Sequence, residues 1–107
     1  MIIKDWNIEA MTGYKPKTTF YTDFSIADNF GVEAIKDTYK RAFKHWHNDV
    51  EFVTELVMAL NWKIWEHHNA GNDKIARLYD ELWREADEWC YTNLEGDNLS
   101  YYLRTID

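Results

Sequence analysis

The sequence has few residues that interrupt regular structure: four Gly, one Pro and one Cys occur among its 107 residues. So few chain breakers argue against a turn-rich β-sandwich and against a disordered chain, and they favour long helices. The single thiol, Cys90, excludes an internal disulfide and any zinc or redox motif built on a cysteine pair. We therefore expect a helical, cytoplasmic protein in which Cys90 is buried and unreactive.

Long apolar runs are also missing. No stretch approaches the ~18 apolar residues that a membrane-spanning helix needs, and residues 1–11 lack the basic start and apolar core of a signal peptide. We expect neither export nor a membrane partner. Gly-rich phosphate loops, dinucleotide fingerprints and Ser-His-Asp signatures are absent as well, so no cofactor is expected and a non-enzymatic role is favoured.

Aromatic residues and acidic charge are abundant. Six Trp, seven Tyr and five Phe must supply much of the core. The net charge of −7 is unevenly spread: residues 1–48 hold seven Lys/Arg and six Asp/Glu, whereas residues 49–107 hold five and thirteen. An acidic second half repels nucleic acid and membrane surfaces and attracts a basic partner.

The spacing of apolar residues predicts one all-α domain over residues 1–107. We expect a compact bundle of about four main helices around a central buried helix, with residues 1–21 forming an N-terminal arm packed on the bundle. The predicted helices are a short one over 23–30, an amphipathic one over 32–48, the central one over 50–69, a fourth over 73–93 and a short C-terminal turn over 99–106.

The central helix carries apolar groups on two opposite sides. One stripe consists of Val53, Leu56, Val57, Leu60 and Ile64, and the other of Met58, Trp62 and Trp65. A helix that is apolar on two sides is usually buried. Either the N-terminal arm covers the second stripe, or a partner or a second copy of the chain covers it, which leaves a homodimer open.

The acidic polar face of the fourth helix is the leading candidate for binding a basic partner. It is formed by Asp80, Glu81, Glu85, Asp87 and Glu88, with help from any exposed part of Met58, Trp62 and Trp65. Grouped carboxylates can also hold Mg²⁺ together with water and phosphate oxygens. An alternative is therefore a magnesium-dependent helical nucleotide pyrophosphatase-like hydrolase that uses Glu51, Glu55, Glu85 and Glu88, although its usual Glu-x-x-Glu and Glu-x-x-Asp pairing is not reproduced.

A basic row on the second helix supports a further alternative. Lys36, Lys40 and Lys44 follow each other every four residues, and His47 extends the row. Such a row could hold phosphate in a nucleotide-binding sponge, or it faces solvent or pairs with acidic residues. The four histidines lack the i, i+4 spacing of a zinc helix, and we expect capping or polar surface roles for His67 and His68.

Five short stretches resemble a family of small uncharacterised proteins from Firmicutes and their phages and mobile elements. They are MTGYKPKTTF at 11–20, DFSIAD at 23–28, TELVM at 54–58, LNWKIW at 60–65 and LSYY at 99–102. The resemblance covers most of the chain from about residue 11. It implies a small accessory protein of a mobile element, and it brings no catalytic residue.

Together these features predict a non-enzymatic acidic protein-interaction module that binds a host or phage protein with a basic surface. Its most concrete form is an anti-CRISPR-like inhibitor of a host nucleic-acid-defence protein. Carboxylates of the second half would take the place of nucleic-acid phosphates, and attraction to a basic channel would be strongest at low salt.

Overall fold

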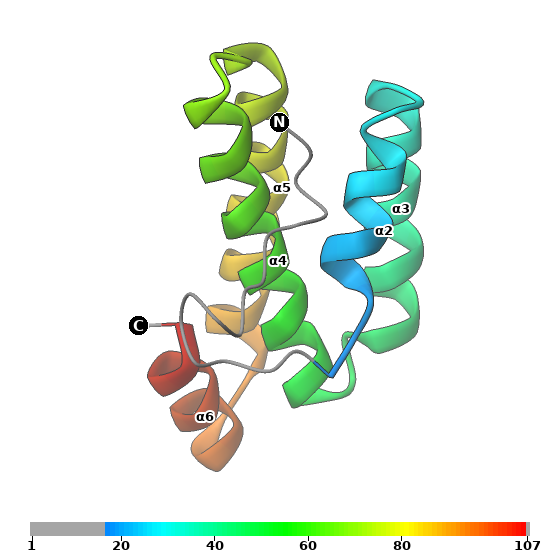
Figure 1. The fold of residues 1–107 in the computed structure, drawn as a ribbon. Helices are drawn as coiled ribbons and strands as arrows, with labels where there is room; N and C mark the ends of the chain where they lie inside the picture. Colours follow the sequence, from blue (N-terminus) through cyan, green and yellow to red (C-terminus); the bar gives the residue numbers. More distant parts are fainter. Residues whose placement is uncertain (1–16, 107) are drawn as a thin grey trace.

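A computed structural model describes residues 17–106, and within this range the chain forms helices and no strands (Figure 1). The predicted all-α class is therefore confirmed. The helices are α2 at Phe20–Ala27, α3 at Val32–Trp46, α4 at Val50–Asn69, α5 at Asp73–Asn93 and α6 at Gly96–Ile106. Across these residues, no helix combines the length and the apolar character needed to cross a membrane.

The ends of the helices follow local chemistry. Asp49 caps α4 because its side chain accepts from the backbone N–H groups of Glu51 and Phe52. Gly71 has a φ of 77° and lies in the turn that ends α4, where the N–H of Asn72 donates to the carbonyl of His67. This left-handed conformation suits glycine, which is the usual residue at the carboxyl end of a helix.

Three helices differ from their predicted bounds, and the smallest difference is in α3, which ends at Trp46 rather than at 48. α2 spans Phe20–Ala27 rather than 23–30, because burying Phe20 favours an earlier start and the hydroxyl of Thr19 reaches the carboxylate of Asp23 at 3.0 Å. The C-terminal turn is an eleven-residue helix that begins at Gly96. Its polar first turn precedes the predicted start at residue 99, and Asp97 there complements the positive end of the helix dipole.

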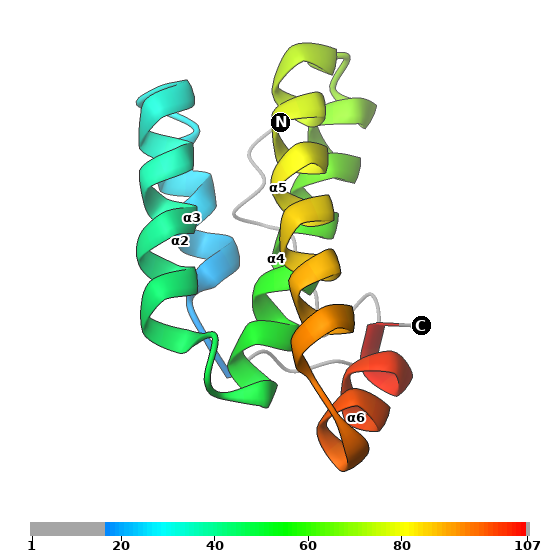
Figure 2. The same cartoon turned by 180° about the vertical axis from the view of Figure 1, so that it is seen from behind.

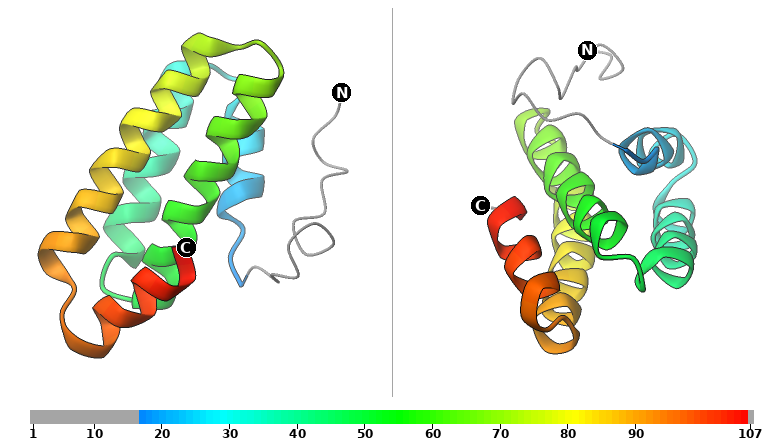
Figure 3. Two further views of the ribbon diagram at one scale, coloured as in Figure 1. Left: turned by 90° about the vertical axis from the view of Figure 1, so that its left-hand side faces the viewer. Right: turned by 90° about the horizontal axis from the view of Figure 1, so that it is seen from below.

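The central helix of the bundle is α4, which packs against α2, α3, α5 and α6. α2 and α3 form an antiparallel pair on one side, and α5 runs antiparallel to α4 on the other (Figures 1 and 2). α6 packs across the end where α5 finishes and α4 begins (Figure 3). The predicted stripe on α4 forms the middle of the core, and its members Val53, Leu56, Val57 and Leu60 are at most 1% exposed.

Burial on α4 extends to a side that the sequence analysis did not single out. Trp65 is 54% exposed, and Met58 and Trp62 are half-buried. The side that packs on α2 carries Lys63 and Glu66 instead, and both are buried. The predicted cover for the tryptophans is an arm that falls mainly on residues 1–16, which lie outside the described residues.

Candidate functional site

Three exposed carboxylates lie together on α5. Glu81, Glu85 and Glu88 are exposed and follow each other at spacings of four and three residues, so they share one face of the helix. Within residues 17–106 no ion pair or hydrogen bond engages these three carboxylates. Their charge is therefore available to a partner.

The other two predicted acidic residues are used within the chain. Asp80 accepts from Nε of Arg84 at 2.8 Å, which compensates both charges. Asp87 accepts from the hydroxyl of Tyr102, a side chain that is fully buried where α6 meets α5. The five predicted carboxylates thus divide into three that face solvent alone and two that are paired.

The position of the three free carboxylates is electrostatically unfavourable for the helix itself. Like charges spaced three or four residues apart, as in Glu81 with Glu85 and Glu85 with Glu88, cost about 0.2–0.5 kcal/mol per pair. Arg77 lies four residues before Glu81, and Arg84 lies four residues before Glu88, so these arginines offset part of the repulsion within α5.

The predicted metal ligands are not brought together. Glu55 is buried and accepts from the backbone N–H groups of Lys17 and Thr18 at 2.9 and 3.1 Å and from the Thr18 hydroxyl at 3.1 Å. Glu51 pairs with Nζ of Lys17 at 2.8 Å. Both residues therefore hold the segment that leads into α2, whereas Glu85 and Glu88 face solvent on α5.

The basic row on α3 is shorter than predicted. Lys40 and Lys44 are exposed and Lys36 is half-buried. His47 lies instead against aromatic rings, stacked on Phe43 with ring centroids 5.2 Å apart and edge-on to Trp89 at 5.5 Å. Its Nδ1 atom is 2.8 Å from the carbonyl oxygen of Phe43, so His47 does not extend a phosphate-binding row.

A buried charge cluster joins α2, α4 and α5, and the sequence analysis missed it. Its centre is Lys63, whose side chain is fully buried. The Nζ atom lies 2.6 Å from Oδ2 of Asp28, 2.7 Å from Oε2 of Glu66 and 3.1 Å from the Ser25 hydroxyl. One ammonium group therefore contacts two carboxylates, one from α4 and one from the residue that follows α2.

Tyrosine and histidine side chains complete the cluster. The hydroxyl of Tyr21 donates to Oε1 of Glu66 and that of Tyr79 to Oδ1 of Asp28, each at 2.5 Å. Nε2 of His67 lies 2.9 Å from Oδ2 of Asp28, and because a carboxylate can only accept, this nitrogen carries the proton. The predicted surface or capping role of His67 is wrong, since its ring stacks on Tyr79 between the helices.

The electrostatics of Asp28 reflect this enclosure. Burial on its own would raise the pKa of the Asp28 carboxyl, but hydrogen bonds from His67, Lys63 and Tyr79 outweigh burial and lower the pKa below its ordinary value of 3.8. These three bonded groups therefore keep Asp28 ionised inside the protein.

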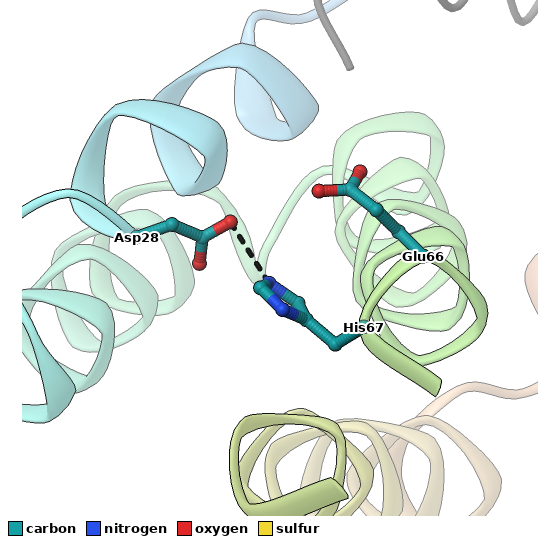
Figure 4. Close-up of side chains that lie close together, drawn as sticks. All are labelled: Asp28, Glu66 and His67. Atoms are coloured by element: carbon teal, nitrogen blue, oxygen red, sulfur yellow. Dashed lines mark hydrogen bonds and ion pairs between the residues drawn. The ribbon is translucent and has the colours of Figure 1, made fainter. Parts of the chain in front are cut away.

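The cluster contains a trio of side chains that could in principle bind a metal ion. Asp28, Glu66 and His67 each offer a ligand atom within 4.8 Å of the others (Figure 4), and this is the one such trio among residues 17–106. The ammonium group of Lys63 already lies against one oxygen of each carboxylate. Within the same residues every buried polar side-chain atom has a hydrogen-bond partner. The polar groups of the cluster are therefore satisfied by one another, and the cluster serves to link the helices.

The remaining nucleophile candidate is equally enclosed. Cys90 is fully buried on α5, and burial raises the pKa of its thiol to about 12. A thiol with so little thiolate at neutral pH is a poor nucleophile. The expectation of a buried, unreactive cysteine fits this environment.

Comparison of the chain with protein-family models, with curated proteins and with solved structures finds no match in any of the three. No residue role is therefore carried over from a relative. The resemblance to small proteins of Firmicutes and their mobile elements stays a prediction, and the functional argument rests on the charges and contacts described above.

Proposed function

We propose that this chain is a non-enzymatic protein-binding module that captures a basic partner through the acidic face of α5, formed by Glu81, Glu85 and Glu88. The observation that carries the proposal is the exposure of these three carboxylates, which have no counter-charge within ion-pair distance among residues 17–106. A basic surface would supply that counter-charge and relieve the repulsion among them.

The chemistry of the other charged groups supports binding rather than catalysis. The buried ions of the Lys63 cluster are engaged with one another, and Glu55 holds backbone N–H groups. Catalytic groups need access to a substrate and a protonation state suited to proton transfer. The carboxylates left free face solvent on α5, where they can attract a partner and set its orientation.

The narrowest form of the proposal concerns a nucleic-acid-binding defence protein as the partner. Such proteins carry basic channels that bind the phosphate backbone. The row of Glu81, Glu85 and Glu88 covers seven helical positions at ~1.5 Å per residue, a length comparable to the spacing of two or three successive phosphates. The α5 face would then compete with nucleic acid for the channel.

Affinity capture with charge-reversed α5 tests this function. The wild-type chain is immobilised, and bound proteins from a lysate of the source organism are identified at low and high salt. The variant carries Glu81→Lys, Glu85→Lys and Glu88→Lys. We expect the wild type to retain a basic protein that high salt or added nucleic acid releases, and the variant to lose it.

A second triple variant controls for net charge. It reverses three exposed acidic residues on α3, on the α5–α6 connection and on α6, namely Glu33, Glu95 and Asp97. The control should retain the partner, because its overall charge changes equally while the α5 face stays intact. Equal retention by the α5 variant and the wild type would overturn the proposal.

A further inference from the structure

A groove opens on the surface between α2 and α3, and no residue of α5 lines it. Its volume is about 690 Å³. Three of the five large apolar side chains that are exposed in the described part of the chain line this groove, namely Ile26 at 55%, Phe30 at 75% and Trp46 at 41% exposure. Exposed apolar side chains that gather in one place mark an interaction surface more often than scattered ones do.

The α3 wall of the groove carries both signs of charge. Asp37 and Arg41 lie one helical turn apart and are exposed, and within residues 17–106 neither has an ion-pair partner. The small side chains of Ala34, Thr38 and Ala42 lie between and beside these two residues. Small residues along one helix face let a second helix approach closely.

We propose that the occupant of this groove is a second copy of the chain, related by a two-fold axis that passes level with residue 39 of α3. In such an antiparallel pair, position 37 of one helix lies level with position 41 of the other. Asp37 of each copy then faces Arg41 of its partner, and the contact forms twice because a two-fold interface is self-complementary.

The apolar ends of the groove fit the same symmetry. Phe30 precedes the start of α3 and Trp46 ends it, so an antiparallel pair brings the Phe30 end of one copy to the Trp46 end of the other. Each of these rings is too exposed to be a core residue of the single chain. Pairing would bury both on the flanks of the central charges.

The distribution of charge favours this face for self-association. Residues 17–48 hold five Lys/Arg and four Asp/Glu, whereas residues 49–106 hold five and twelve. Two copies that met through α5 would press acidic faces together, but two that meet through α2 and α3 bring nearly neutral surfaces into contact. The dimer would also leave both α5 faces outside the contact, where two linked sites strengthen binding to a repetitive partner.

Two opposite charge reversals test the pairing. Asp37→Arg places like charges across the axis in its own homodimer, and so does Arg41→Glu. Each variant alone should therefore be a monomer of 12.9 kDa at concentrations where the wild type sediments as a dimer. In an equimolar mixture, the two arginines of the first variant face the aspartate and the introduced glutamate of the second, so the dimer should return.

Sedimentation velocity over a concentration series measures the outcome, and circular dichroism checks that each variant is helical. A wild type that stays monomeric throughout the series would overturn the proposal, as would variants that dimerise alone. If a charge reversal fails to fold, Phe30→Ser serves instead, because this side chain is 75% exposed. It should weaken dimerisation at least tenfold without loss of helix, and an unchanged dimer would equally overturn the pairing.

Discussion

The ammonium group of Lys63 on α4 lies 2.6 Å from Oδ2 of Asp28, the residue that follows α2. Its second carboxylate, that of Glu66, is 2.7 Å away on α4 itself. A charge taken out of water is stabilised only when its partners are close and fully hydrogen-bonded. This contact therefore ties α2 to α4 through a side chain that has no exposed surface.

Removing the ammonium group should destabilise the fold strongly. We expect Lys63→Met to lower the free energy of unfolding by about 3–5 kcal/mol, because the carboxylates of Asp28 and Glu66 are left buried without a positive charge. Urea denaturation at neutral pH, followed by circular dichroism, measures the loss.

Lys74→Met is the matched control, since Lys74 is exposed in the first turn of α5. It should change stability by no more than about 0.5 kcal/mol. Adding Asp28→Asn and Glu66→Gln to Lys63→Met should recover part of the loss, because no buried charge remains. Equal effects of the two lysine substitutions would contradict the assigned role of Lys63.

Acid should weaken the protein through Asp28. Its pKa in the folded chain is lower than the ordinary value of 3.8, so the folded state binds its proton less readily than the unfolded state does. A carboxyl of this kind contributes full stability above the unfolded pKa and loses it as the pH falls through the folded pKa. In the wild type, the free energy of unfolding should decrease as the pH falls below 3.8. Asp28→Asn should lack this decrease.

Urea denaturation across a series of acidic pH values measures this dependence. The stability difference between wild type and Asp28→Asn should shrink as the pH falls. Ser25→Ala is the control, because it removes a hydroxyl next to Lys63 without removing a titrating group, and its difference from wild type should stay constant. A pH-independent difference for Asp28→Asn would rule out the proposed linkage.

The helices were predictable because their signals are local. The stripe of Val53, Leu56, Val57 and Leu60 follows the helical period, and Gly71 marks the end of α4 with a conformation that only glycine adopts readily. The start of α2 was missed by three residues because Phe20, which reads as part of an extended arm, gains enough from burial to begin the helix. Tertiary packing decides such boundaries, and no local pattern records it.

The buried charge cluster escaped the sequence analysis for a different reason. Lys63 and Glu66 are charged, so a periodicity based on apolar residues assigns them to the surface. Their partners Asp28 and Tyr79 come from other parts of the chain, and nothing in the local sequence indicates this proximity. A weak signal was present, since Ala59, Lys63 and Glu66 continue along α4 at the spacings of four and three residues that define a buried face.

The spacing correctly predicted that these carboxylates lie on one helix, but it did not predict which of them are paired within the chain. Asp80 and Asp87 looked equivalent to Glu85 from their spacing alone. Their engagement by Arg84 and by Tyr102 depends on side-chain reach and on α6, which folds back onto α5. The structure therefore narrows the proposed binding face to three residues.

Glu55 should act as a structural anchor rather than as a metal ligand. Its buried carboxylate accepts from two backbone N–H groups and one hydroxyl, so Glu55→Gln should cost about 1.5–3 kcal/mol, the range for hydrogen bonds to a charged group. Amide hydrogen exchange at Lys17 and Thr18 should also speed up. Both quantities can be measured on the same sample by denaturation and NMR.

Glu51→Gln separates anchoring from simple charge loss. Glu51 meets the same segment through an exposed pair with Lys17, and such pairs contribute less than about 1 kcal/mol. Its substitution should leave amide exchange at Thr18 unchanged. Similar effects of the two glutamine variants would show that charge near α2 matters more than the specific hydrogen bonds of Glu55.

Glu85→Lys should separate binding from stability. This substitution removes the like-charge spacings with Glu81 and Glu88 and places a cation one helical turn from both acids. It should therefore raise the free energy of unfolding by about 0.3–0.5 kcal/mol. The same change should weaken capture of a basic partner and flatten its dependence on salt.

Glu33→Lys provides the comparison, because Glu33 is an exposed acid in the first turn of α3. There a negative charge complements the helix dipole, so the reversal should lower stability slightly while partner capture stays intact. Urea denaturation and salt-dependent capture of the partner, measured for both variants, give four results, and each has a stated expected outcome. A Glu85→Lys chain that is less stable than wild type and still binds its partner would show that the α5 carboxylates serve the fold. A more stable chain that no longer binds would show that they serve the interaction.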